Sequence, residues 1–312
     1  MLSRTADSLF WTARYMERAD FLARILDSAL RVSSMPAANV GPNTWESVIA
    51  SAGVADAFAA KHQAATEKTV RDFLAFDPEN SSSIYSCLAT ARANGRAVRT
   101  ALTTEMWECV NDVWHELQQK DGAKMGREAF TQFLEWVEHV TLAFDGSARR
   151  TMLRNDAYWF LRLGGAVERA DNTARILDVK YHLLLPDREQ VGGGLDHFQW
   201  TTILREVSAL TAYHWVYRDR VKPWLVADLL ILNSQAPRSL ASCYEVIVRH
   251  LDMLADAYGK RGPSQRLAQR ISSELAESRI DHIFQSGLHE FITRFLSDNA
   301  QVAAAIAEQY LV

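Results

Sequence analysis

Two segments of the chain repeat one pattern of acidic and basic residues, and these residue types could build a polar site. Segments 17–27 and 168–178 are identical at nine of eleven positions. Carboxylates bind cations and amines or exchange protons, whereas arginine binds phosphate and carboxylate groups. The candidate polar site includes the charged residues that both segments share: Glu17, Arg18, Asp20, Arg24 and Asp27, and Glu168, Arg169, Asp171, Arg175 and Asp178.

Helical spacing places most of these residues in one stripe along each segment. In the first segment the stripe is formed by Glu17, Asp20, Arg24 and Asp27. Three interpretations are open. The stripe could be a solvated face with ion pairs four residues apart, or a partly buried ion network that fixes how two halves dock. It could also line a pocket, where carboxylates bind a cation or amine and arginines bind phosphate or carboxylate.

The repeated motif does not favour a transition-metal centre. A helical di-iron site uses Glu-x-x-His pairs, whereas Glu17 and Glu168 are each followed three residues later by aspartate. His182 lies four residues after Asp178 and could share a metal with it, although a histidine near a helix C-terminus is more often structural. We therefore expect no metal site and keep His182 within the candidate polar site.

A second group of candidates surrounds two turns that contain serine. Ser82 and Ser83 precede a helical segment, and the corresponding turn later in the chain contains Arg238 and Ser239. Such serines can cap a helix or bind an anion, and capping is the more common role. Further candidates for anion or partner contacts follow Ser83: Arg92, Asn94, Arg96 and Arg99. Glutamates farther along the chain offer the alternative that these arginines form solvated ion pairs.

Composition limits the classes of partner and cofactor. The net charge of the 312 residues is only −4, which argues against binding to nucleic acid or an anionic membrane surface. Three cysteines form no C-x-x-C pair, which favours reduced thiols and a cytoplasmic location. The first residues lack the apolar run of a signal peptide or a membrane span. Phosphate-binding loops, zinc spacings and nucleophile elbows do not occur in the sequence, so we expect no intrinsic cofactor.

The segments that hold these residues are predicted to be helices. Hydrophobic residues make up 48% of the chain and recur every three or four positions, and only seven prolines interrupt the pattern. Two long helices are expected at 3–33 and 155–185, each with one copy of the motif, and another at 196–218. A turn is expected at Asp145 and Gly146. We therefore predict an all-α, multi-helix bundle.

The similarity between the two segments continues beyond the motif and predicts an internal duplication. Downstream, Trp45 aligns with Trp200 and Phe58 with Tyr213. Farther on, Cys87 aligns with Cys243, together with serines just before each cysteine. A repeat of this length indicates that one structural unit was copied, and copied units commonly pack with two-fold symmetry. We expect a single domain over residues 1–312 made of two helical halves, 1–147 and 148–312, related by an approximate two-fold axis.

These motifs resemble the bacterial alpha-E domain family, a family of unknown function. The resemblance covers nearly the whole chain and is carried by residues 1–6, 14–19, 82–84, 94–99, 105–108, 168–171, 175–182 and 237–239. The Gly-Arg pair that is usual before each motif in the family appears here as Ala13-Arg14 and as Gly164-Gly165. Arg14 joins the candidate polar site through this resemblance, and the second copy lacks the corresponding arginine.

The resemblance also implies a partner. Proteins similar to this one are typically encoded or fused beside a circularly permuted ATP-grasp protein, often with transglutaminase-like peptidases. This context implies a system that forms amide or peptide bonds, with ATP and Mg²⁺ bound by the partner enzyme. We therefore expect a helical accessory or substrate-positioning component of an ATP-grasp amidoligase, in contact with a peptide or amino-acid substrate and not catalytic alone.

Two alternatives are open at this point. The chain could be an enzyme that acts on the ligase product or on an acyl intermediate, with paired carboxylates as acid and base groups. Glu17, Asp20, Glu168 and Asp171 would supply those groups. The chain could instead be a non-catalytic, homo-oligomeric helical scaffold that binds no ligand.

Overall fold

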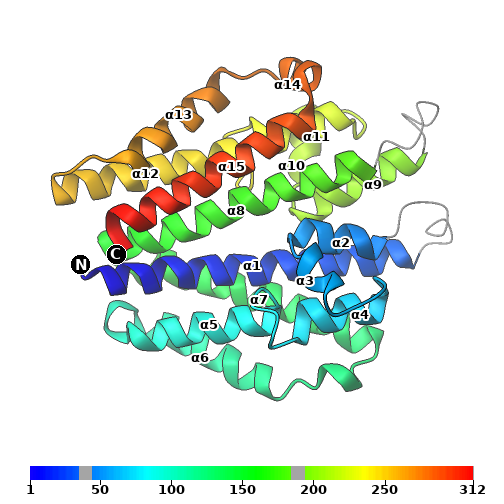
Figure 1. Ribbon diagram of the computed structural model, residues 1–312, viewed down its shortest axis with the longest axis horizontal. Helices are drawn as coiled ribbons and strands as arrows, with labels where there is room; N and C mark the ends of the chain where they lie inside the picture. The colour runs from blue at the N-terminus through cyan, green and yellow to red at the C-terminus, as the bar shows by residue number, and fades with distance from the viewer. Residues whose placement is uncertain (35–43, 184–193, 312) are drawn as a thin grey trace.

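The described part of the chain forms an all-α, multi-helix bundle, as the sequence predicts (Figure 1). The computed structural model describes residues 1–34, 44–183 and 194–311, and only the backbone at 179–183 and 194–198. These residues contain no strand, and none of their helices is long and apolar enough to cross a membrane. The helices are α1 (Ser3–Ser33), α2 (Thr44–Ala52), α3 (Ala55–Ala59), α4 (Glu67–Arg71), α5 (Ile84–Ala97), α6 (Thr104–Gln118), α7 (Arg127–Thr151), α8 (Asp156–Leu183), α9 (Gly194–Glu206), α10 (Leu210–Tyr217), α11 (Pro223–Ile231), α12 (Leu240–Tyr258), α13 (Pro263–Glu277), α14 (Ile280–Ser286) and α15 (Leu288–Ile306).

The two long helices that carry the repeated motif lie side by side in the middle of the bundle. Helices α1 and α8 run in the same direction, and the Met1 amino group lies 3.2 Å from the Asp156 carboxylate at their shared starting end (Figure 1). Their backbones approach closely at Gly164, where a Cβ atom would lie 2.0 Å from the Phe10 carbonyl oxygen. The missing side chain of Gly164 is therefore what lets the two helices meet at this point.

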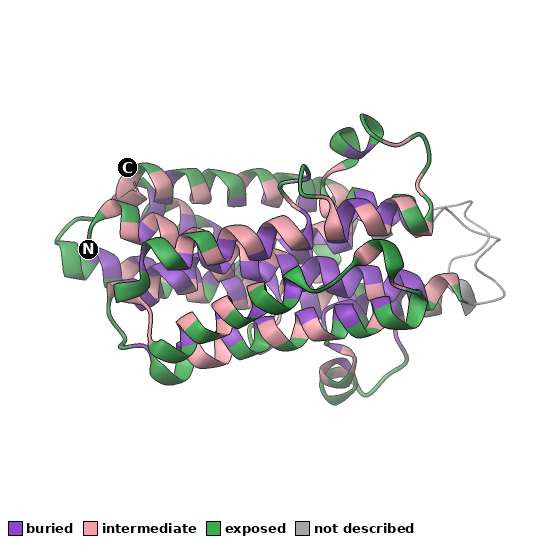
Figure 2. Ribbon diagram, turned by 90° about the horizontal axis from the view of Figure 1, so that it is seen from below, coloured by how far each residue is buried: buried purple, intermediate pink, exposed green. Residues whose placement is uncertain are grey.

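Each central helix is covered by helices that follow it in the chain. Helix α1 packs on α5 and α7, and α8 packs on α12 and α15. Buried residues concentrate along these contacts, while exposed residues lie on the outer faces of the bundle (Figure 2). In both predicted halves, the first long helix thus packs against two helices that follow it in the chain. The internal duplication itself stays a prediction from the sequence.

Helices α5 and α12 begin at the aligned serines. The Ser83 hydroxyl accepts a hydrogen bond from the Ser86 N–H at 3.1 Å and donates to the Asp77 carbonyl at 2.7 Å. The Ser239 hydroxyl accepts from the Ser242 N–H at 3.0 Å, and it also donates to a backbone carbonyl of the preceding turn. Both serines therefore act as helix caps, which satisfy N–H groups that have no partner within the helix.

Helix α7 continues through Asp145 and Gly146, so the turn predicted there is wrong. The side chain of Asp145 projects from the continuous helix and pairs with Arg149 at 2.7 Å and with Arg162 of α8. A single glycine inside a helix costs only about 1 kcal/mol relative to alanine, which the packing of α7 outweighs. The predicted boundary between residues 147 and 148 consequently falls within α7.

The helix predicted at 196–218 is interrupted, and the structure forms α9 and α10 in its place. The interruption centres on Ser208, whose φ of 54° lies in the left-handed region. Residues other than glycine adopt this region only occasionally. Because the turn has serine in place of glycine, nothing in the sequence signals it. The turn brings Ser208 next to α1, where it contributes to the candidate site.

Candidate functional site

The two copies of the Glu-Arg motif exchange ion pairs across the contact between α1 and α8. The Arg169 guanidinium donates from Nε and Nη2 to the two carboxylate oxygens of Glu17, at 2.8 and 2.6 Å. In the opposite direction, Arg18 Nε donates to Glu168 Oε1 at 2.6 Å. Each glutamate is therefore paired with the motif arginine of the other helix.

The second arginine on each glutamate comes from a different part of the fold. Glu168 accepts a hydrogen bond from Arg14 Nε at 2.7 Å, and Arg14 lies on α1. Glu17 instead accepts from Arg238 Nη1 at 2.9 Å, and Arg238 lies in the turn before α12. Gly165 stands in the second motif where Arg14 stands in the first, so Arg238 supplies the charge that this motif lacks.

We call Glu168, Arg14 and Arg18 the Glu168 cluster. The Glu168 residue is only 2% exposed. Its arginines lie over aromatic rings of α1: Arg14 is 4.5 Å from the Trp11 ring centre and Arg18 is 5.6 Å from that of Tyr15. Burial alone would raise the pKa of Glu168, but Arg18 and Arg14 outweigh burial and lower it. The carboxylate is therefore ionised at neutral pH.

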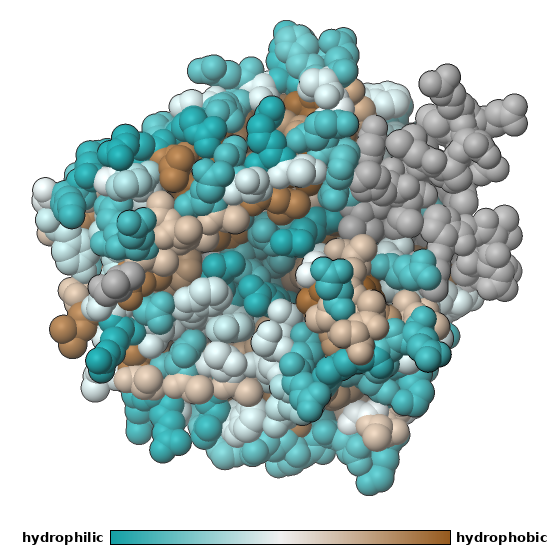
Figure 3. All heavy atoms as spheres, in the orientation of Figure 1, coloured by the Kyte–Doolittle hydropathy of each residue, from teal (hydrophilic) through white to brown (hydrophobic). Residues whose placement is uncertain are grey.

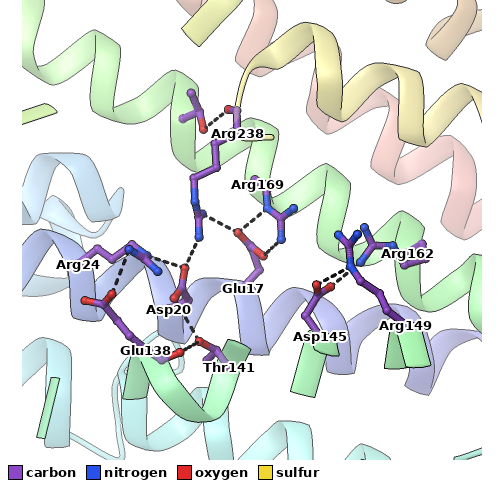
Figure 4. Close-up of polar contacts among 11 residues, drawn as sticks. Glu17, Asp20, Arg24, Glu138, Thr141, Asp145, Arg149, Arg162, Arg169 and Arg238 are labelled. Carbon is purple, nitrogen blue, oxygen red and sulfur yellow. Dashed lines mark hydrogen bonds and ion pairs between the residues drawn. The ribbon is translucent and has the colours of Figure 1, made fainter. Parts of the chain in front are cut away.

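We call Glu17, Asp20, Arg24, Arg169 and Arg238 the Glu17 cluster (Figure 4). Asp20 accepts hydrogen bonds from Arg238 at 2.6 Å, from Arg24 at 2.9 Å and from the Thr141 hydroxyl at 3.1 Å. Burial would raise the pKa of Asp20, yet Arg238 and Arg24 hold it below its ordinary value. Asp20 is thus a second ionised carboxylate, and it links Arg238 to Arg24.

These contacts favour the buried ion network among the three interpretations of the charged stripe. Glu17, Asp20 and Glu168 are almost completely buried, and each accepts hydrogen bonds from two arginines. The arginines lower the pKa values of Asp20 and Glu168, so these two carboxylates are weak proton acceptors. The geometry therefore gives the paired carboxylates a positioning role more readily than an acid–base role.

The outer ends of the two stripes lie nearer to solvent. Asp171 pairs with Arg175 at 2.6 Å, as the spacing of four residues predicts. Asp27 pairs with Arg31 at 2.7 Å. Asp178 contacts the His289 ring of α15, with 2.5 Å between Nδ1 and Oδ1. The side chain of His182, which the sequence placed with Asp178, lies outside the described residues.

The other predicted anion or partner contacts are distributed differently. The sequence placed Arg238 among the anion or partner contacts, whereas the structure places it in the Glu17 cluster. Its position in a turn gives no helical period that would link it to Glu17. Arg92 donates to Asn111 Oδ1 at 3.1 Å. Arg99 lies 5.3 Å from the ring centre of Trp107, and the Ser82 N–H donates to the side chain of Asn80. Of the remaining two, Asn94 is half-buried and Arg96 is exposed.

The Glu17 cluster borders two hollows. A cavity of about 70 Å³ lies beside Glu17, Arg169 and Arg238. A larger pocket of about 400 Å³ lies at the Arg24 end, and we call it the polar pocket. Its described lining residues are Arg24, Asp27, Ser28, Arg31, Val32, Glu138, Thr202, Arg205, Glu206, Ser208, Leu210 and Thr211.

Arg24 connects the buried network to the polar pocket. Its Nε bonds to Asp20, while its Nη1 lies 3.0 Å from Glu138 Oε2 and donates to the Ser208 hydroxyl at 2.7 Å. Asp20 and Glu138 together raise the pKa of Arg24 against the effect of burial. Within the described residues no group of three or more histidine, cysteine or acidic side chains is arranged to hold a metal ion.

Comparison with known proteins places the chain in a family. Residues 1–311 match the Alpha-E family, described as a predicted alpha-helical domain with a conserved ER motif, and the chain belongs to that family. The Glu-Arg dipeptide occurs twice in this sequence, as Glu17-Arg18 and Glu168-Arg169. These are the glutamates and arginines that form ion pairs between α1 and α8.

Two curated relatives are much longer than this chain. Uncharacterized proteins of Mycobacterium bovis and Mycobacterium tuberculosis are each 22% identical to it over 318 aligned residues. The match covers 94% of this chain and 35% of each relative, so the chain spans about a third of their length. No solved structure matches the chain.

Proposed function

We propose that this protein is a substrate-positioning component of an ATP-grasp amidoligase system. In this proposal it docks on a circularly permuted ATP-grasp enzyme in the cytoplasm and holds the peptide or amino-acid substrate. The partner binds ATP and Mg²⁺ and forms the amide bond. One observation carries the proposal: the Glu-Arg network ends at Arg24 in a pocket of about 400 Å³ lined by both arginines and carboxylates.

The volume and the lining of the polar pocket support a small polar ligand. Small-molecule sites commonly measure about 300–1,000 Å³ and contain a few polar groups in fixed positions. Arg24 is 8% exposed, and Asp20, Glu138 and Ser208 hold its guanidinium in place. Binding costs less when such groups are already ordered, so a buried network behind the pocket favours affinity.

The length of the relatives supports a partner enzyme. The region that matches this chain makes up about a third of each mycobacterial relative, so there it belongs to a larger polypeptide. A domain that works beside another domain within one chain can also work beside a separate protein chain. The mostly hydrophilic face in Figure 3 suits a transient contact with such an enzyme, because transient interfaces are more polar than permanent ones.

A reconstituted ligation assay tests the proposal. A circularly permuted ATP-grasp enzyme of the proposed system is assayed with this chain, without it, and with Arg205→Ala at the edge of the polar pocket. We expect kcat/KM to fall at least tenfold without the chain and in the Arg205 variant. The matched control is Arg266→Ala, an exposed arginine on α13, which should retain full activity. Ligation that is indifferent to the chain would reject the proposal.

The same assay separates positioning from catalysis. In a catalytic role for the paired carboxylates, Glu17→Gln combined with Glu168→Gln would abolish product formation even when substrate is saturating. In a positioning role, Arg205→Ala raises KM and leaves kcat nearly unchanged, because it weakens substrate binding without touching the reacting atoms. A homo-oligomeric scaffold would leave both kinetic constants unchanged in the Arg205 variant.

A further inference from the structure

The polar pocket brings acidic, basic and apolar side chains together, in a combination that matches one class of ligand. Four helices contribute: Asp27 and Arg31 come from α1, Glu138 from α7, Arg205 from α9, and Leu210 from the first turn of α10. The pocket thus presents carboxylates, guanidinium groups and apolar carbons together. A ligand with an ammonium group, a carboxylate and a short aliphatic side chain is complementary to all three.

The carboxylates favour a positive group in the pocket. Glu138 is only partly neutralised by Arg24, and the charges of Asp20 and Asp27 also act on it. Burial raises the pKa of Glu138, and Asp20 and Asp27 raise it further, although Arg24 lowers it. A ligand ammonium beside Glu138 and Asp27 would relieve this repulsion between carboxylates, because an opposite charge stabilises the ionised form.

The arginines of the pocket favour a carboxylate at the other end of the ligand. Arg31 uses its Nε for Asp27, and a guanidinium has five N–H donors, so further donors of Arg31 can reach a ligand. Arg205 is exposed at the pocket and carries the same fork of donors. Such forks match the two oxygens of a carboxylate, which makes arginine well suited to bind the C-terminal end of a peptide.

The backbone at the pocket is held in an uncommon conformation. Ser208 has a φ of 54°, and its hydroxyl accepts a hydrogen bond from Arg24 Nη1 at 2.7 Å. Non-glycine residues adopt the left-handed region only rarely, and residues that do so cluster at ligand sites. The contact with Arg24 holds this turn against the network, so the pocket wall formed by Ser208 is tied to the Glu17 cluster.

We propose that the polar pocket binds a zwitterionic dipeptide, with its ammonium group on Asp27 and Glu138 and its carboxylate on Arg31 and Arg205. Val32 and Leu210 would contact its side chains. This inference rests on the proposed function, since it names the class of substrate that the chain holds for the ligase. It adds that recognition depends on both charged ends of the ligand.

The test is binding to the full chain alone, measured by isothermal titration calorimetry without the ligase. The probes are alanyl-alanine, dipeptides with one acidic or basic side chain, N-acetyl-alanyl-alanine and alanyl-alaninamide. We expect saturable binding of at least one free dipeptide, and at least tenfold weaker binding after either end is blocked. A tenfold change corresponds to about 1.4 kcal/mol. Equal binding of blocked and free forms, or no binding of any free dipeptide up to the millimolar range, would overturn the inference.

Variants assign the two ends of the ligand. Asp27→Asn should weaken alanyl-alaninamide at least tenfold more than N-acetyl-alanyl-alanine, because only the former has the ammonium group and Asp27 also pairs with Arg31. Arg205→Ala should do the reverse, and Arg266→Ala should change neither. Arg205 is exposed, so its variant keeps the test valid if Asp27→Asn fails to fold by circular dichroism. If the chain binds dipeptides but leaves ligation unaffected, only the proposed function is rejected. If ligation needs the chain but the chain binds no dipeptide, only this inference is rejected.

Discussion

The Glu168 cluster and the Glu17 cluster contain the same motif residues in different surroundings. At Glu168 both arginines come from α1 and lie over aromatic rings of that helix. At Glu17 one arginine comes from α8 and the other from the turn before α12, and Asp20 continues the network to Arg24. One copy of the motif thus ends in a local cluster, while the other reaches a pocket.

The largest expected effect comes from removing either glutamate. Glu168→Leu leaves Arg14 and Arg18 without their carboxylate, and Glu17→Leu does the same to Arg169. Breaking a buried ion pair from one side costs about 3–5 kcal/mol, so urea unfolding should show a loss of this size in each variant. The exposed control Glu245→Leu should stay within about 0.5 kcal/mol of the natural chain. A loss at only one glutamate would show that the clusters are not energetically equivalent.

A smaller effect should distinguish the second arginines. Arg238 bonds to two carboxylates, Glu17 and Asp20, whereas Arg14 bonds only to Glu168. Hydrogen bonds to charged groups contribute about 1.5–3 kcal/mol each. Arg238→Ala should therefore lower the free energy of unfolding by about 1.5–3 kcal/mol more than Arg14→Ala does. Equal losses in the two variants would contradict the wider network at Glu17.

The close contact between α1 and α8 gives a third test, because both clusters depend on it. Gly164→Ala forces a Cβ against the Phe10 carbonyl, and overpacking of this kind costs about 1–3 kcal/mol. Gly146→Ala in α7 is the matched control, since a Cβ there meets no atom within 4 Å. It should stabilise the chain by about 0.5–1 kcal/mol in thermal melts. A stabilising Gly164→Ala would disprove the close approach.

The smallest change is expected when the pH is lowered from 7 to 5. The pKa values of Glu168 and Asp20 are lower in the folded chain than their ordinary values, so the folded state binds fewer protons. Their stabilisation is complete above the ordinary values near pH 4 and is lost as the pH falls through the folded values. Urea unfolding should show little change down to pH 5 and a steep loss below 4. In Glu168→Gln the acid loss should be shallower, and an equally steep loss would assign it elsewhere.

Local patterns explain which features could be predicted from the sequence. The apolar period predicts α1 and α8 closely, and the spacing of four residues predicts the pairs of Asp20 with Arg24 and of Asp171 with Arg175. These features depend on residues within a few turns of one helix. The capping roles of Ser83 and Ser239 likewise follow from neighbours three residues away.

Features that depend on distant segments could not be predicted in this way. Arg238 reaches Glu17 across 221 positions, and Thr173 of α8 holds its turn by donating to the Arg238 carbonyl at 2.8 Å. The left-handed Ser208 lacks the glycine that would signal a turn. Helix α7 continues through Gly146 because its packing outweighs the low helix propensity of a single glycine.

The sequence by itself determined that the chain is helical, that it carries one charged motif twice, and which residues share a helix face. Only the tertiary structure decided which charges meet, how deeply they are buried, and that one copy of the motif borders the polar pocket. The physical reason is range. Helix formation and capping depend on residues a few positions apart, whereas ion pairing and burial depend on which helices the whole bundle brings together.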